Sequence, residues 1–281
     1  AVPPDAGPDE IAAAARKVGT PCVVKPTTLA ASQGVIRADS PHDAVATVEH
    51  VRSIARRAGV GPELPVLIER FVPGAEVAIE GLLASGELNV LAVFDKPEPL
   101  DGPYFEESIY VTPSRLPGPD VTAAIQAVQA ATRALGLDDG PVHAEARVHA
   151  GRASVVEVAA RTIGGLCSRT LRFATGRSLE ELVIAHAIGK EQDTTWWGGA
   201  SGVLMLPTPR AGRFVEVTGQ SDAFAVPGVT EVDITVAPGS PVVPVPEGDR
   251  YIGFVFARDR RPERVERALR RARDLLHVVI D

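Results

Sequence analysis

Residues 141–159, PVHAEARVHAGRASVVEVA, decide the fold. Polar and apolar residues alternate on both sides of a turn at 149–152, which has Gly151 at its centre. Because alternation with a period of two is typical of β-strands and glycine favours tight turns, the stretch predicts an antiparallel hairpin. If the hairpin folds about Gly151, Glu145 lies directly opposite Glu157.

Two facing carboxylates need a physical explanation. Opposed Cβ atoms in a hairpin are about 4.5–5.5 Å apart, and like charges at that distance repel. The two groups therefore share a proton, splay into solvent, or hold a divalent cation between them. The same alternation places on their face His143, Arg147, Ala159 and Arg161. It directs toward the core Ala144, Ala146, Val156 and Val158. A face that carries one histidine, two glutamates and arginine favours a functional site over a merely solvated surface.

The composition limits the kinds of partner. The chain has 281 residues and a net charge of −7, so we expect no nucleic-acid-binding surface spread over it. No run approaches the roughly 20 apolar residues of a membrane helix, so we expect no membrane partner. Cys22 and Cys167 cannot build a disulfide framework or, alone, a zinc site, which favours a reducing cytoplasm. The usual Walker, GxGxxG, HExxH and CxxC signatures are absent from the sequence.

The order of predicted elements indicates an α+β fold. The spacing of apolar residues predicts helices over 9–19, 41–58, 119–136, 178–188 and 262–276, and short strands over 20–25, 64–71, 76–84 and 88–94. Residues 95–118 hold five prolines and no period, which predicts a long functional loop. We expect three parts, namely a small subdomain at 1–72, a larger one with the hairpin at 73–197, and a β-rich C-terminal subdomain at 198–281.

Lys25 is a candidate phosphate ligand. The chain has only four lysines, and this one ends the apolar strand TPCVVK just before Pro26. The loop that follows, TTLAASQGV, has small side chains that let backbone N–H groups approach an anion. A cation beside such a loop can hold a polyphosphate, although a lysine before a turn is also commonly just solvated.

Residues 67–76, LIERFVPGAE, are a second candidate for nucleotide binding. The strand leaves its sheet at Pro73, so the backbone of residues 70–72 could bind the edge of a heterocycle. Glu76 could accept hydrogen bonds from ribose hydroxyls. The alternative is that Phe71 and Val72 are plain core residues.

These pieces together resemble the ATP-grasp fold, in which two α+β subdomains grip ATP. The resemblance is carried by VVKP at 23–26, SQGV at 32–35, ERFVPGAE at 69–76, HAE at 143–145 and EVAAR at 157–161. Within that superfamily, DKPEPLDGPYFEESIYVTPSRLP and EVAARTIGG resemble the L-amino acid ligase group. Ala159 stands where many relatives have Asn, as is common in the ligase branch.

The resemblance implies a role for each matching residue. Nucleotide ligands would be Lys25, Ser32, Gln33, Gly34, Val35, Glu69, Arg70, Phe71, Val72, Glu76 and His143. The metal ligands would be Glu145 and Glu157, holding Mg²⁺ or, as an alternative, Mn²⁺. Arg161 would stabilise an acyl phosphate, and Glu107 would act beside it. The amino-acid substrates would meet Tyr110, Gly164 and Gly165.

The function implied by the resemblance is an ATP- and magnesium-dependent carboxylate–amine ligase acting on L-amino acids. Two alternatives stay open, a carboxylase or synthetase that forms carboxyphosphate, and a non-catalytic ATP-binding module of a larger synthetase. ATP-grasp proteins place an N-terminal domain before the point where this sequence begins. We therefore expect that domain elsewhere in the same chain or in a partner, and a homodimer is a further expectation.

Overall fold

The computed structural model describes residues 1–190 and 193–281. The helices are α1 (Pro8–Val18), α2 (Pro41–Arg57), α3 (Gly118–Ala134), α4 (Leu179–Ala187), α5 (Gln220–Phe224) and α6 (Pro262–Leu275), with a 3₁₀ turn at Cys167–Thr170. The strands of the first half are β1 (Cys22–Pro26), β2 (Ile36–Ala38), β3 (Val66–Arg70), β4 (Ala75–Ala84), β5 (Glu87–Asp95), β6 (Ile109–Thr112) and β7 (Gly140–His149). Those of the second half are β8 (Arg152–Ala159), β9 (Ala200–Leu206), β10 (Gly212–Thr218), β11 (Val229–Ile234), β12 (Pro241–Val242), β13 (Gly253–Asp259) and β14 (His277–Ile280).

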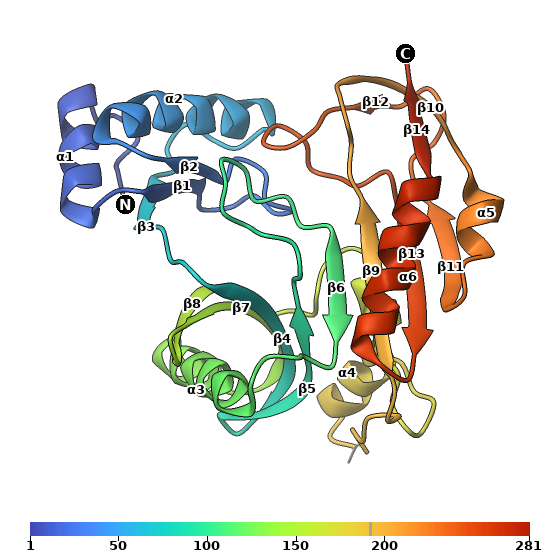
Figure 1. The fold of residues 1–281 in the computed structure, drawn as a ribbon. Coiled ribbons are helices and arrows are strands. Elements are labelled where there is room, and N and C mark those ends of the chain that lie inside the picture. Colours follow the sequence, from blue (N-terminus) through green and yellow to red (C-terminus); the bar gives the residue numbers. More distant parts are fainter. Residues whose placement is uncertain (191–192) are drawn as a thin grey trace.

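The N-terminal part is a small α+β unit. Its antiparallel sheet has the order β2-β1-β3, and α1 and α2 pack against it, as Figure 1 shows in blue. The α2 helix begins where the Ser40 hydroxyl accepts a hydrogen bond from the Asp43 amide, and Pro41 fits the first helical turn. Its apolar stripe, Ala44, Val48, Val51 and Ile54, is buried in the core of this unit. This unit therefore has its own hydrophobic core and presents the end of β1 to the rest of the molecule.

The rest of the molecule is built on one antiparallel eight-stranded sheet. Its order is β11-β13-β9-β6-β5-β4-β7-β8. A third, three-stranded sheet has the order β12-β10-β14. The large sheet runs across the predicted boundary at 197–198, because β6 pairs with β9. The three-part division stays a prediction, with its second and third parts sharing a continuous sheet.

One face of the large sheet packs against helices, and the other carries polar residues. Alternate residues of each strand point to opposite faces. One face packs against α3 and α6, with Ile79 of β4 and Val255 of β13 in the cores beneath these helices (Figure 1). The opposite face carries the polar residues of β4 and β7, so the two helices support the face from which a site is built. None of the helices in the described ranges is long and apolar enough to cross a membrane.

The β7–β8 hairpin confirms the predicted pairing of Glu145 with Glu157 and corrects its turn. The turn consists of Ala150 and Gly151 alone, both with positive φ (49° and 75°), as a tight two-residue turn requires. That turn by itself would pair Glu145 with Val156. The ladder shifts by one residue beside Glu145, because Val156 is an extra residue in β8. The expectation that Val156 points to the core is therefore wrong, and Val155 packs there instead.

The predicted structureless loop at 95–118 contains a strand. Residues 109–112 form β6, which is buried in the middle of the large sheet. Four residues are too few to show a period between prolines, and this strand exists because β5 and β9 pair with it. The loop that remains, 96–108, enters from β5 and leads into β6.

Gly74 fixes the angle at which the chain passes from β3 to β4. Its φ is +118°, and a Cβ atom there would overlap the carbonyl oxygen of Val148 in β7. We expect Gly74→Ala to lower the free energy of unfolding by about 2 kcal/mol or more, from backbone strain and the clash. Urea denaturation measures this loss. Gly61→Ala is the matched control, because its Cβ would meet open space, and an equal loss in both variants would contradict the account.

Candidate active site

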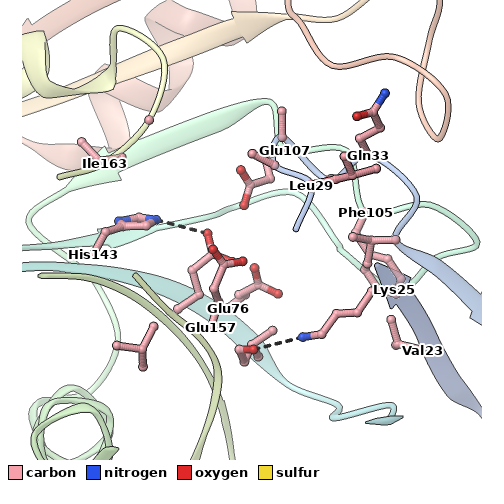
Figure 2. A pocket seen from close by; sticks show the side chains of 18 of the residues that line it. Val23, Lys25, Leu29, Gln33, Glu76, Phe105, Glu107, His143, Glu157 and Ile163 are labelled. Atoms are coloured by element: carbon pink, nitrogen blue, oxygen red, sulfur yellow. Dashed lines mark hydrogen bonds and ion pairs between the residues drawn. The ribbon is translucent and has the colours of Figure 1, made fainter. Parts of the chain in front are cut away.

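A cavity of about 1140 Å³ lies where the small unit faces the polar side of the large sheet. Every residue predicted for the site lines it except Gly34. Figure 2 shows Lys25, Glu76, Glu107, His143 and Glu157 converging from separate elements. The fold thus brings together residues that are far apart in the sequence, such as Lys25 on β1 and Glu157 on β8, which are separated by 132 positions.

Lys25 connects the small unit to the hairpin. Its Nζ lies 2.6 Å from Glu69 Oε2 on the neighbouring strand β3. The same ammonium donates a hydrogen bond of 3.3 Å to the carbonyl oxygen of Val156, the extra residue of β8. Lys25 is therefore a partly buried cation held at the cavity wall by two partners, rather than a freely solvated side chain.

The small-residue loop forms a turn at the cavity wall. Ala31 and Ser32 have φ of 55° and 57°, and residues 29–33 line the cavity. Successive residues of this kind present backbone N–H groups to one side. The amide of Gly34 instead donates to the carbonyl oxygen of Pro246, at 2.8 Å.

The predicted heterocycle-binding segment is already partly hydrogen-bonded. The Phe71 amide donates to Pro21 at 3.1 Å, and the Val72 carbonyl accepts from Arg147 Nη1 at 2.8 Å. The guanidinium of Arg147 also lies over the Phe71 ring, 5.1 Å from its centroid. These contacts fix the chain between β3 and β4. Within the described part of the chain, no backbone hydrogen bond occupies the Phe71 carbonyl or the Val72 amide, so both are available to bind a ligand edge.

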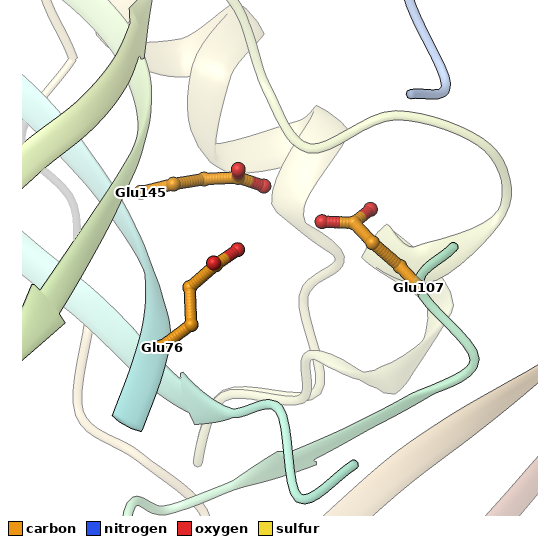
Figure 3. Close-up of side chains that lie close together, drawn as sticks. All are labelled: Glu76, Glu107 and Glu145. Atoms are coloured by element: carbon orange, nitrogen blue, oxygen red, sulfur yellow. The ribbon is translucent and has the colours of Figure 1, made fainter. Parts of the chain in front are cut away.

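Three carboxylates from different elements meet in the cavity (Figure 3). Ligand oxygens of Glu76, Glu107 and Glu145 lie within 4.8 Å of one another, close enough to hold a metal ion. The ammonium of Lys96 lies among them, 2.7 Å from Glu76 Oε1, 2.7 Å from Glu145 Oε1, and in contact with Glu107. Glu76 also pairs with Arg147 at 2.7 Å, so both its oxygens bind cations in this conformation rather than facing a ribose.

Burial and charge set the protonation of this cluster. Burial opposes the charged form of Lys96, but attraction by Glu107, Glu145 and Glu76 outweighs it and raises the pKa of Lys96 well above its usual range. Burial and the neighbouring Glu145 raise the pKa of Glu107 to about 7, against the opposing effect of Lys96. Burial acts in the same direction on Glu145, yet Lys96 and His143 lower the pKa of that carboxyl well below its usual range. Glu145 is therefore ionised, whereas Glu107 is the carboxyl that accepts a proton more readily.

His143 is held between two carboxylates. Its Nδ1 lies 2.5 Å from Glu80 Oε1 and its Nε2 3.5 Å from Glu145 Oε1. Burial would lower the pKa of His143, but the hydrogen bonds and charges of Glu145 and Glu80 raise it to about 9. The imidazolium and the Lys96 ammonium therefore both lie against Oε1 of Glu145 and orient it.

Glu145 and Glu157 offer oxygen ligands of the kind that Mg²⁺ prefers. Glu145 is 13% exposed and fixed by its neighbours, whereas Glu157 is 53% exposed at the cavity wall. Arg161 Nη2 lies 4.0 Å from Glu157 Oε1, and its Nη1 donates to the Thr162 carbonyl at 2.8 Å. One fixed and one adjustable carboxylate facing each other fit a divalent cation.

The remaining predicted residues, Tyr110, Gly164 and Gly165, also line the cavity. Tyr110 is buried on β6, and its hydroxyl donates a long hydrogen bond of 3.4 Å to Glu145. Gly164 and Gly165 line the cavity next to Arg161. Gly165 has φ +61°, and a Cβ there would press on the Phe254 ring, so this position requires glycine for its backbone as well as for space.

Sequence reasoning missed two residues that organise the site. Lys96 lies in the proline-rich stretch, where no local pattern points to it. Lysine is scarce in this chain, and that scarcity, which drew attention to Lys25, applies equally to Lys96. Glu80 lies inside the apolar run of β4, and a buried carboxylate in such a run signals a partner on the next strand. Both are at most 3% exposed at the side chain.

The cavity is shared between two α+β units and is lined by the lysine, the small-residue loop and the carboxylates that the sequence predicts for a nucleotide-binding site without a Walker loop. The chain matches the ATP-grasp domain over residues 18–170 and the L-amino acid ligase C-terminal domain 2 over residues 204–281. Since the first match covers more than half of it, the chain belongs to the ATP-grasp family.

Its relatives include amino acid ligases. The alanine–anticapsin ligase of Bacillus subtilis is 29% identical over 203 residues, which cover 66% of this chain and 42% of that protein. The crystal structure of an L-amino acid ligase from Bacillus licheniformis superposes with a TM-score of 0.77 at 29% identity, over 95% of this chain and 66% of that one. An N5-carboxyaminoimidazole ribonucleotide synthetase from Thermotoga maritima shares the fold, with a TM-score of 0.67 and 18% identity. The chain spans about half the length of the curated relatives it matches.

Lys96 neutralises buried carboxylates, so its removal is expected to destabilise the protein. We expect Lys96→Met to lower the free energy of unfolding by about 3–5 kcal/mol at pH 7, because the acidic groups lose their partner. The loss should shrink at pH 5, where protonation of the cluster relieves the repulsion. Urea denaturation at both pH values measures it, with the exposed Lys17→Met as control. A loss that does not depend on pH would contradict this electrostatic role.

His143 should make stability depend on pH in the alkaline range. Its folded pKa of about 9 lies above the ordinary value of 6.5. Its stabilising contribution is therefore complete below pH 6.5 and is lost as the pH rises through 9, by about 3 kcal/mol. Unfolding free energies from pH 6.5 to 10 should show this fall in the wild type and lack it in His143→Gln. An NMR titration of the imidazole with a midpoint near 6.5 would refute the assignment.

Proposed function

We propose that this chain provides the ATP site of a carboxylate–amine ligase whose substrates are L-amino acids. The proposal rests on one observation: Glu145 and Glu157 face each other in the cavity. Arg161 lies beside Glu157, and Lys25 lines the same cavity. A carboxylate pair, an arginine and a lysine suit a reaction that moves a phosphoryl group and stabilises negative charge.

The nucleotide would lie along the junction of the two units. Lys25 and the amides of residues 29–32 would bind its phosphates, since a fixed cation and a run of backbone N–H groups both attract phosphate oxygens. The chain at residues 70–72 would bind the heterocycle. Magnesium, held by Glu145 and Glu157, would neutralise phosphate charge when bound.

The reaction would proceed in two steps. A substrate carboxylate oxygen attacks the γ-phosphorus of ATP, and the bond to the β-phosphate oxygen breaks, releasing ADP and leaving an acyl phosphate. The amine of the second substrate then attacks the carbonyl carbon, loses a proton and expels phosphate. Arg161 stays a cation throughout and can stabilise the charge that develops on the acyl phosphate. The buried Glu107 can bind the ammonium of an amino acid.

The relatives support this choice of reaction within the family. The names of the alanine–anticapsin ligase and of the L-amino acid ligase specify joining of amino acids. The carboxyphosphate-forming enzymes share the fold at a lower identity, so they carry less weight. A cytoplasmic location, a homodimer and a domain that completes the substrate pocket belong to the same proposal.

Trapping of the acyl phosphate tests the proposal most simply. The full-length protein is incubated with ATP, Mg²⁺, pooled L-amino acids and hydroxylamine, and amino acid hydroxamates and ADP are measured. We expect both products to form together and to depend on an amino acid. Arg161→Ala should lower hydroxamate formation by about 10²-fold or more, as loss of a transition-state charge partner commonly does.

Each alternative gives a different result in this assay. ADP release that requires bicarbonate instead of amino acids would replace the ligase by carboxyphosphate chemistry. ATP binding without ADP release under any of these conditions would favour a non-catalytic module.

A further inference from the structure

Residues 243–249, in the C-terminal part of the chain, extend to α2 and to the small-residue loop at 27–35, which we call the phosphate loop (Figure 1). The Pro246 carbonyl accepts a hydrogen bond from the Gly34 amide at 2.8 Å. The Glu247 carbonyl accepts one from Gln33 Nε2 at 2.7 Å. The Glu247 side chain in turn pairs with His50 Nε2 on α2, at 2.7 Å. Three contacts thus connect one short segment to the phosphate loop and to α2 of the small unit.

These contacts hold the outer side of the loop. Residues 29–33 line the cavity, whereas Gly34, Pro246 and Glu247 do not. The segment therefore supports the loop from behind and leaves its inner face open to a ligand. An inhibitory segment would instead cover that inner face.

The loop needs such support because its backbone is strained. Ala31 and Ser32 both adopt left-handed φ angles, which residues with a side chain rarely do. Conformations of this kind persist only where the surroundings fix them. Gln33 and Gly34 directly follow these two strained residues, and their hydrogen bonds to Pro246 and Glu247 hold them in place.

The supporting segment has a shape that requires glycine. The Gly248 amide donates to the Pro244 carbonyl at 2.8 Å and closes a turn. A Cβ at Gly248 would overlap the carbonyl oxygen of Val243. This tight turn is what directs the carbonyls of Pro246 and Glu247 toward the loop.

We propose that residues 243–249 are a latch that holds the phosphate loop in its ATP-binding conformation, with Glu247 as a positioning residue. The inference rests on the proposed nucleotide site and adds a part of the C-terminal subdomain to it. The latch makes ATP affinity depend on a segment that does not touch the nucleotide.

Two variants open the latch by different routes. Glu247→Ala removes the pairing with His50, and Gly248→Ala breaks the turn. Glu247→Gln is the conservative variant, because a carboxamide can still hydrogen-bond to His50. Glu231→Ala is the matched control, since it removes an exposed ion pair with Arg169 in the same subdomain. The readouts are the Kd of Mg-ATP by calorimetry and hydrogen exchange of peptides that cover residues 29–36 in the nucleotide-free protein.

We expect both latch-opening variants to exchange faster in this loop and to bind Mg-ATP about three- to tenfold more weakly, the effect of losing a hydrogen bond or two. Glu247→Gln and Glu231→Ala should match the wild type in both readouts. Unchanged exchange in both opened variants, or tighter binding of Mg-ATP, would overturn the latch, the second by making it inhibitory. If the wild type binds no Mg-ATP, the proposed function fails, and the exchange measurement still decides whether the latch holds the loop.

Discussion

One extra residue in β8 determines how the rest of the site is assembled. The two-residue turn alone would place Val156 opposite Glu145, and the bulge at Val156 brings Glu157 there instead. The same bulge offers the Val156 carbonyl to Lys25, which joins the hairpin to the small unit. Bulges commonly occur next to active sites because they redirect a side chain without breaking the sheet. Here one irregularity positions the carboxylate pair and the lysine together.

The cavity is stable without a ligand because its charges are balanced internally. Lys96 neutralises three carboxylates that would otherwise repel, and it enters on the 96–108 loop. Ion pairs outside the cavity anchor the start of that loop. Asp95 pairs with Arg115, which reaches Glu266 on α6 at 2.6 Å, and Glu98 pairs with Arg273 at 2.5 Å. The C-terminal part of the chain therefore fixes the start of the loop that carries Lys96 and Glu107, and it also contacts the phosphate loop.

Local sequence patterns predicted much of this structure, and non-local pairing accounts for what they missed. The alternation around Gly151 was enough to predict the hairpin, since a hairpin is a local structure, but the pairing of Glu145 with Glu157 also depends on the bulge at Val156, which the alternation does not reveal. Nothing local distinguishes a four-residue strand such as β6 from a loop, because it forms only between β5 and β9. The position of Lys96 likewise depends on strands and a loop that converge from distant parts of the chain. The roles of the individual site residues stay predictions, although the fold gathers nearly all of them around one cavity.

The central claim is that Glu145 and Glu157 together hold the divalent cation of the nucleotide. A substitution of Glu157 is easier to interpret than one of Glu145, because Glu157 is half-exposed and lies outside the cluster around Lys96. Mn²⁺ in place of Mg²⁺ allows binding to be followed by the loss of the free-ion EPR signal in the presence of ADP. The account predicts that Glu157→Gln weakens Mn-ADP binding at least about tenfold, the loss of one charged ligand, while thermal unfolding of the ligand-free protein is unchanged. Equal Mn-ADP affinity in the wild type and in Glu157→Gln would contradict it.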